Sequence, residues 1–180
     1  MAPGSDPVAI SKFLSHALRH APASYGLTMD AQGWVAVADI LARAPMPLDR
    51  ATLDAVAAGS DKRRFAFSPD GTRLRANQGH SVAVDLGLAP QTPPDLLWHG
   101  TATRFLASIR AEGLKPGARR HVHLSADRET AARVGARHGK PAILTVRSGA
   151  MAAAGHIFHL SDNNVWLTAA VPLAFLDFPD

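Results

Sequence analysis

The sequence predicts an α+β protein built from two lobes. Three short helical patterns followed by a hairpin occupy the first half, and strands with interspersed short helices occupy the second. Between these halves, residues 87–95 contain three prolines and little charge, which is typical of a linker. The predicted boundaries are therefore residues 1–86 for the first lobe, 87–95 for the linker and 96–180 for the second lobe.

The first predicted helix begins with Asp6 as its cap and Pro7 in its first turn. Its apolar residues recur at helical spacing and form one stripe: Ile10, Phe13, Leu14, Ala17 and Leu18. Arg19 and His20 then fall in the last turn, where cationic side chains suit the helix dipole.

The remaining elements of the first lobe are short. We expect helices through residues 37–41 and 48–58, and strands at 65–67 and 73–75 on either side of a turn at 68–72. A further strand is expected at 81–84. Three small helices and a hairpin indicate a winged-helix domain, which is a common nucleic-acid binder.

In the second lobe, an apolar strand at 96–98 is expected to end at residues 99–101. A helix through residues 105–111 then closes at Gly113, a helix-ending glycine. We expect another helix over 128–137, and strands at 121–125, 142–147, 156–160 and 165–168.

The composition limits the chemistry. The chain has 180 residues, a formal net charge of +4 and no cysteine, which excludes disulfides and thiolate zinc sites. Most of the positive charge is arginine, whose planar fork grips phosphate oxygens in pairs. This small positive net charge fits a protein that binds a phosphate-bearing ligand at a discrete site, although it fits other soluble proteins as well.

The N-terminal residues lack the basic-then-apolar order of a secretory signal, and no apolar run is long enough to span a bilayer. We therefore expect a cytoplasmic protein without membrane contact. We also expect it to be a monomer.

Two stretches of the first lobe are candidates for anion binding. Residues 75–81 place Arg75 before small and amide residues, which can present backbone N–H groups beside a guanidinium. The alternative is a surface loop with a solvated arginine. Arg19 and His20 have a routine alternative as well, since such pairs often complement a helix end.

The second lobe offers further candidates. His99, Gly100 and Thr101 combine a side-chain donor, an unhindered backbone and a hydroxyl, as a ribose or adenine edge requires, but ordinary turns share this composition. His121 and His123 alternate on one face of a strand; without a nearby carboxylate or cysteine, ligand contact or half-burial is favoured over a metal. Residues 137–141 are rich in positive charge, but such residues are also common at an ordinary helix end. Residues 161–168 combine a polar turn with an apolar strand, and the alternative there is an ordinary hairpin.

The sequence contains no glycine-rich Rossmann or Walker loop, G-x-S-x-G elbow or H-E-x-x-H pair. From Ile10 to about Leu176 the chain instead resembles the KptA-type RNA 2′-phosphotransferases. The matching segments stand in the family's order: 11–14 with 18–20, 26–27 with 33–35, 75–81, 97–101, 121–125, 134–141, 164–168 and 171–172.

This resemblance implies a winged-helix lobe followed by a C-terminal ADP-ribosyltransferase-type mixed β lobe. The family's four catalytic side chains correspond to Arg19, His20, Arg75 and Arg137. Its NAD signature corresponds to His99, His123 and Val165, with three further residues beside the dinucleotide: Gly100, Thr101 and Ser125.

The implied activity is NAD-dependent removal of an internal RNA 2′-phosphate, with NAD as co-substrate and no metal. The products are RNA with a 2′-hydroxyl, nicotinamide and ADP-ribose 1″,2″-cyclic phosphate, in a setting such as tRNA splicing or RNA repair. The alternatives are an ADP-ribosyltransferase that caps phosphorylated nucleic-acid ends and a non-catalytic winged-helix nucleic-acid-binding protein.

Overall fold

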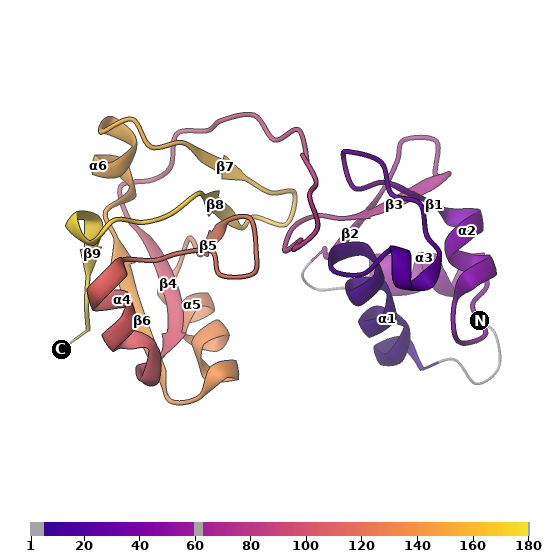
Figure 1. Cartoon of the computed structure of the whole chain (residues 1–180), viewed down its shortest axis with the longest axis horizontal. Coiled ribbons are helices and arrows are strands. Elements are labelled where there is room, and N and C mark those ends of the chain that lie inside the picture. Colours follow the sequence, from indigo (N-terminus) through magenta and orange to yellow (C-terminus); the bar gives the residue numbers. More distant parts are fainter. Residues whose placement is uncertain (1–5, 60–62, 180) are drawn as a thin grey trace. The chain divides into compact units, whose positions relative to one another are not determined.

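The structure is a computed structural model that describes residues 6–59 and 63–179. The chain forms two compact units, Met1–Gly87 and Leu88–Asp180, here named the N-terminal and C-terminal units (Figure 1). Both combine helices with small antiparallel sheets, in agreement with the predicted α+β class. No helix within 6–59 or 63–179 is long and apolar enough to cross a lipid bilayer.

The N-terminal unit packs three α-helices against a three-stranded antiparallel sheet of order β1-β3-β2. Its elements are α1 (Pro7–Arg19), a 3₁₀ turn (Ala23–Tyr25), β1 (Val35–Ala36), α2 (Val37–Arg43), α3 (Arg50–Ala58), β2 (Phe65–Phe67) and β3 (Arg73–Ala76). The predicted hairpin is confirmed, because β2 and β3 pair across the turn at 68–72. The winged-helix assignment stays a prediction.

Helix α1 forms as its sequence predicts. Asp6 accepts a hydrogen bond from the backbone N–H of Val8 at 2.9 Å, and Pro7 occupies the first turn. The five residues of the predicted stripe are all buried. This buried face packs against α3 and β3, so the capped end and the apolar stripe together set the position of α1.

The strand expected at residues 81–84 is wrong. The N–H groups of Ser81 and Val82 both donate to the carbonyl oxygen of Arg19, at 2.9 and 3.3 Å. The last carbonyl of α1 lacks a partner within the helix, and this segment supplies one instead of pairing with a strand. The two-residue strand β1 was not predicted.

The C-terminal unit contains two three-stranded antiparallel sheets, of order β4-β6-β9 and β5-β8-β7. Its strands are β4 (Leu97–Ala102), β5 (Val122–Leu124), β6 (Pro141–Val146), β7 (Phe158–Leu160), β8 (Trp166–Thr168) and β9 (Leu176–Asp177). Its α-helices are α4 (Leu106–Glu112), α5 (Arg128–Gly135) and α6 (Ser148–Ala153), with 3₁₀ turns at Thr103–Phe105, Ala136–His138 and Leu173–Phe175. Trp98 and Ser125 exchange backbone hydrogen bonds of 2.9 and 2.8 Å and so join the two sheets.

Most predicted elements of this unit are confirmed within two residues of their ends, including Gly113 as the cap of α4. The strand end predicted at residues 99–101 is wrong, because β4 continues to Ala102 and pairs with β6 along its whole length. Helix α6 and strand β9 were not predicted.

Helix α5 lies directly against β4, and glycine makes this possible. A Cβ atom on Gly100 would lie 1.7 Å from the carbonyl oxygen of Ala131 and 2.9 Å from the backbone nitrogen of Gly135. A Cβ on Gly135 would in turn lie 2.6 Å from the carbonyl oxygen of Thr101. Neither position has room for a side chain, so the two backbones meet.

Candidate active site

The N-terminal unit gathers basic side chains at the C-terminal end of α1. Arg19 is the last residue of the helix, and His20 caps it. Nδ1 of His20 hydrogen-bonds with Oγ of Ser81 at 2.9 Å, while the Nε and Nη2 atoms of Arg19 are buried. Gly79 passes beside this arginine with a φ of +89°, and a Cβ there would lie 3.6 Å from Cδ of Arg19.

Arg75 lies in β3, two residues before the loop of residues 77–82 starts. Two contacts hold its guanidinium group. Its Cζ atom lies 4.5 Å from the centroid of the Trp34 ring, within cation–π range. Its Nη1 donates to the carbonyl oxygen of Leu86 at 3.3 Å. These contacts orient the guanidinium before any ligand binds.

We name Arg19, His20 and Arg75 the N-terminal basic cluster. The loop of residues 77–82 connects its members, because it follows the strand that carries Arg75 and hydrogen-bonds to the helix end that carries Arg19 and His20. The cluster combines two guanidinium groups with an imidazole, donors that suit phosphate oxygens.

In the C-terminal unit, His99 and His123 meet where β4 adjoins β5. Nδ1 of His99 donates to the carbonyl oxygen of His123 at 3.0 Å, so in the neutral ring Nε2 is an acceptor. Burial lowers the pKa of His99, the hydrogen bond to His123 opposes this, and electrostatic interactions with Arg119 and His138 lower it further. His99 is therefore expected to be neutral near pH 7.

This lowered pKa predicts a loss of stability in acid. Unfolded histidine titrates near pH 6.5, so below that pH the unfolded chain binds a proton that the folded ring of His99 resists. The stabilising contribution is present above about pH 6.5 and disappears as the pH falls through the lower folded pKa. We expect His99→Gln to reduce the decline in the free energy of unfolding between pH 7 and pH 5, measured by urea titration.

His121 contributes with the same sign, because burial, His159 and Arg120 lower its pKa too. Some pH dependence should therefore remain in His99→Gln. An unchanged pH profile in this variant would contradict the assignment to His99.

The other predicted NAD contacts lie in two different settings. Ser125 is partly exposed and lies two residues after His123. Leu124 pairs with Trp166, the first residue of β8, and Val165 directly precedes that strand. Val165 is also held by a hydrogen bond from its N–H to Oγ of Ser161, 3.1 Å long.

Gly100 and Thr101 are different, because both are buried where α5 covers β4. The structure gives this pair a packing role, whereas His99, His123 and Ser125 keep part of their surface accessible.

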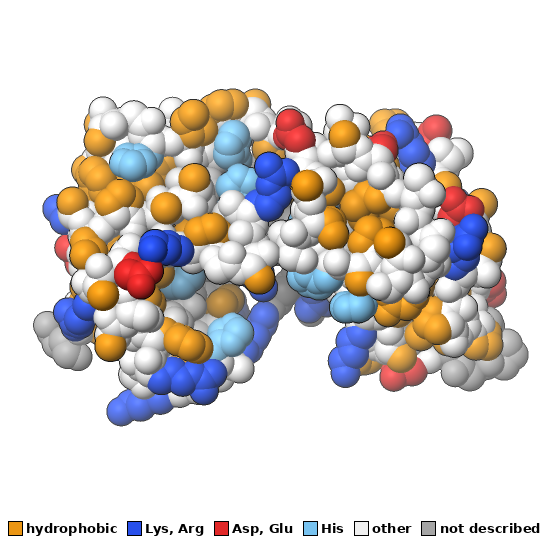
Figure 2. Space-filling model, viewed as in Figure 1, with side chains coloured by type: hydrophobic (Ala, Val, Ile, Leu, Met, Phe, Trp, Pro, Cys, Tyr) orange, Lys and Arg blue, Asp and Glu red, His pale blue; other side chains and the backbone are white. Residues whose placement is uncertain are grey.

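Arg137 lies in the 3₁₀ turn that follows α5, and its side chain is exposed. This turn is anchored to the end of β4, since the N–H of Thr103 donates to the carbonyl oxygen of Lys140 at 2.9 Å. On the face drawn in Figure 2, lysine and arginine side chains of the C-terminal unit gather along its lower edge. The five residues of the predicted charge concentration, 137–141, are all exposed.

The contacts of three supporting residues were not predicted from the sequence. Ser81 and Trp34 belong to the matching segments, but nothing local shows that they contact His20 and Arg75. Arg119 was missed altogether, although its Nη1 donates to Nδ1 of His123 at 3.0 Å. The only signal in the sequence for this contact was the spacing of four positions between Arg119 and His123.

His121 lies edge-on to His159, with 6.1 Å between the centroids of the two rings. Over the described ranges, no group of three or more histidine, aspartate or glutamate side chains is arranged to hold a metal ion.

Comparison with known proteins identifies the family. Residues 5–170 match the family model described as RNA 2′-phosphotransferase, Tpt1 / KptA family. A relative from Agrobacterium fabrum is 61% identical over 171 residues, covering 93% of this chain and 92% of the relative. One from Streptomyces griseus is 56% identical over 179 residues (94% and 95%), and one from Flavobacterium johnsoniae is 50% identical over 173 residues (94% and 95%).

All three relatives carry the name "Probable RNA 2′-phosphotransferase". The match spans both units and includes every residue of the N-terminal basic cluster. The chain therefore belongs to the RNA 2′-phosphotransferase (Tpt1 / KptA) family.

Proposed function

We propose that this protein is an NAD-dependent RNA 2′-phosphotransferase that moves an internal 2′-phosphate from RNA to ADP-ribose. Family membership supports the transferase activity. The observation that carries the proposal is the N-terminal basic cluster, in which the loop that follows Arg75 hydrogen-bonds to the end of α1 that carries Arg19 and His20. The N-terminal unit would act as a winged-helix RNA-binding lobe and the C-terminal unit as an ADP-ribosyltransferase-type lobe.

In the first step, an oxygen of the RNA 2′-phosphate forms a bond to the ribose carbon that carries nicotinamide. The glycosidic bond breaks, and its electron pair leaves with neutral nicotinamide. Phosphate is already anionic and needs no base, so orientation matters most. Arg19 and Arg75 would hold the phosphate oxygens, with Arg137 from the C-terminal unit as a third cation.

In the second step, the neighbouring 2″-hydroxyl oxygen bonds to phosphorus and the bond to the RNA 2′-oxygen breaks. The hydroxyl proton ends on that 2′-oxygen, and ADP-ribose 1″,2″-cyclic phosphate is released. Negative charge builds up on the phosphoryl oxygens, so fixed guanidinium groups are effective stabilisers. His20, oriented by Ser81, would transfer the proton.

The C-terminal unit would hold NAD through His99, His123 and Val165, with Gly100, Thr101 and Ser125 beside the dinucleotide. Since Nδ1 of His99 is engaged by the backbone, its Nε2 can accept a hydrogen bond from a ribose hydroxyl. We propose no metal, because the guanidinium groups of Arg19, Arg75 and Arg137 would supply the positive charge that the phosphate needs.

Replacing His20 by alanine should slow the second step more than the first. In a single-turnover reaction with a 2′-phosphorylated oligonucleotide, ADP-ribosylated RNA should accumulate before RNA with a 2′-hydroxyl is formed. Ser81→Ala should show a weaker form of the same behaviour, because it keeps the imidazole and removes only its hydrogen bond to Ser81. If no intermediate builds up in His20→Ala, the assignment of proton transfer to His20 is wrong.

The function itself is tested by incubating the protein with the same oligonucleotide, with and without NAD. We expect 2′-hydroxyl RNA, nicotinamide and cyclic phosphate only when NAD is present. Stable ADP-ribosylated ends without phosphate removal would instead favour the capping transferase, and binding without nicotinamide release would favour a non-catalytic protein.

A further inference from the structure

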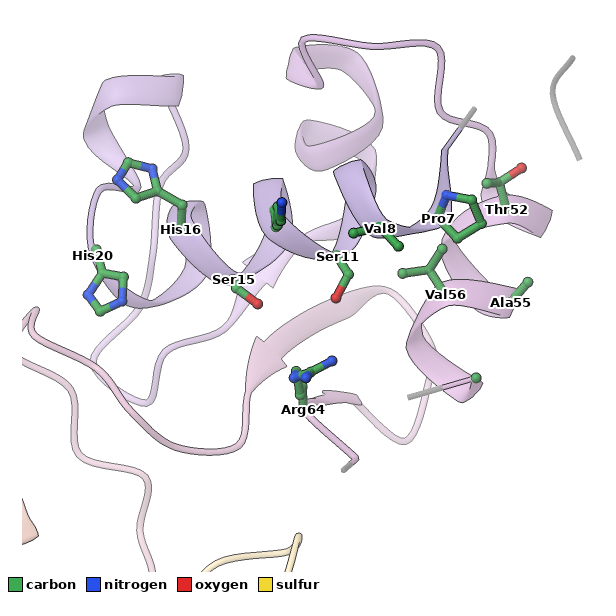
Figure 3. A pocket seen from close by; sticks show the side chains of 12 residues that line it. Pro7, Val8, Ser11, Ser15, His16, His20, Thr52, Ala55, Val56 and Arg64 are labelled. Carbon is green, nitrogen blue, oxygen red and sulfur yellow. The ribbon is translucent and has the colours of Figure 1, made fainter. Parts of the chain in front are cut away.

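A groove of about 750 Å³ runs along α1 in the N-terminal unit. One wall is α1, with Ser11, Lys12 and Ser15, and the groove reaches His20 at the end of that helix. Arg64 and residues of α3, including Val56, also line it. We name this feature the α1 groove (Figure 3).

The α1 groove is positively charged. Lys12 and Arg64 contribute full charges, and none of the described residues that line it is acidic. Lys12 is exposed, and Arg64 is partly buried. Figure 3 shows the hydroxyl groups of Ser11 and Ser15 on the same side of α1, with Arg64 across from them. Cations together with hydroxyl donors are the groups that contact nucleic-acid phosphates.

The α1 groove is also continuous with the proposed reaction centre, because His20 belongs to both. An RNA with an internal 2′-phosphate extends in both directions from the reacting nucleotide. Its flanking strand therefore needs a path away from His20, and this groove begins there.

We propose that the α1 groove binds the single-stranded RNA backbone that flanks the 2′-phosphorylated nucleotide. This inference rests on the proposed function. The reacting nucleotide lies at His20, and the next phosphates pass Ser15 and Ser11 to reach Lys12 and Arg64. The apolar Val56 faces sugars or bases on the opposite wall.

The helix sets the distance at which Lys12 acts. Lys12 and His20 are eight positions apart, and the helical rise places them about 12 Å apart along the axis. A stacked strand advances about 3.4 Å for each nucleotide, so Lys12 meets a phosphate about three to four nucleotides from the reacting one. The contribution of Lys12 must therefore depend on substrate length.

The test compares two substrates, a 2′-phosphorylated dinucleotide and a decamer with the same modified nucleotide at its centre. For Lys12→Ala and Arg64→Ala, we expect KM for the decamer to rise about 10- to 100-fold, as the loss of a hydrogen bond to a charged group implies. KM for the dinucleotide and kcat for both substrates should stay unchanged. The salt dependence of decamer binding, as the slope of log K against log salt concentration, should weaken by about 0.7 for each phosphate that the variant no longer neutralises.

Lys115→Ala is the matched control, since it removes a lysine that lies outside the groove and pairs with Glu112. It should keep wild-type KM and salt dependence for both substrates. Unchanged decamer KM in Lys12→Ala and Arg64→Ala would overturn the proposal, and so would an equal rise in KM for the dinucleotide.

Failure of the proposed function looks different, because the wild-type protein would then remove no phosphate from either substrate. Binding of a fluorescent decamer, measured by anisotropy, still tests the α1 groove in that case. Polyglutamate that competes as well as the oligonucleotide would show that the groove accepts an acidic peptide, and would overturn the proposal.

Discussion

Replacing Arg137 by alanine is expected to lower the rate of 2′-phosphate removal by about 10²- to 10³-fold, the usual cost of one charge-stabilising donor. The stability of the protein should change by less than about 0.5 kcal/mol, because the side chain is exposed on a 3₁₀ turn. Single-turnover formation of 2′-hydroxyl RNA and the urea midpoint measure the two effects.

Two further variants make this result specific. Arg137→Lys keeps the charge but loses the planar fork, so it should recover only part of the activity. Arg133→Ala removes an exposed arginine from the same helix end, where it pairs with Glu129, and should keep full activity. Full activity in Arg137→Ala would refute its role in phosphate binding.

Replacing Gly100 by alanine is expected to lower the free energy of unfolding of the C-terminal unit by at least about 3 kcal/mol, the upper range for overpacking. The added Cβ would lie 1.7 Å from a backbone oxygen of α5, and no flexible side chain can move aside. Helix α5 would have to move off β4, and this movement would also displace the turn that carries Arg137.

The measurement is urea unfolding followed by tryptophan fluorescence in a Trp34→Phe background, where the signal comes from Trp98 and Trp166 of the C-terminal unit. Gly117→Ala is the control, because a Cβ there meets nothing within 4 Å. Its φ of +62° should cost only about 1–2 kcal/mol. If Gly100→Ala costs no more than this control, the tight contact between α5 and β4 does not determine stability.

The elements that could be predicted are those with strong local signals. Helix α1 has a cap, an N-terminal proline and a complete apolar stripe, and the hairpin of β2 and β3 has an unambiguous turn. Strand β9 has two residues and α6 six, so neither shows enough periodicity to be recognised. The segment 81–84 has a strand-like composition, but its first N–H groups bind the end of α1.

The residues of the candidate site likewise fall into those that the sequence predicted and those that only the structure revealed. Arg19, His20, Arg75 and Arg137 were identified from the sequence, because each stands in a segment that resembles the family. Their supports were not, since Ser81 is far from His20 along the chain and Trp34 is far from Arg75.

By itself, the sequence determined the α+β class, most helices and strands, the family and the candidate reacting residues, because capping, periodicity and motif order are properties of neighbouring residues. Only the tertiary structure decided that Ser81 orients His20 and that Trp34 lies against Arg75. It also decided that α5 packs directly on the backbone of Gly100. These are contacts between distant segments. They depend on how helices and strands pack, and no local pattern in the chain encodes that packing.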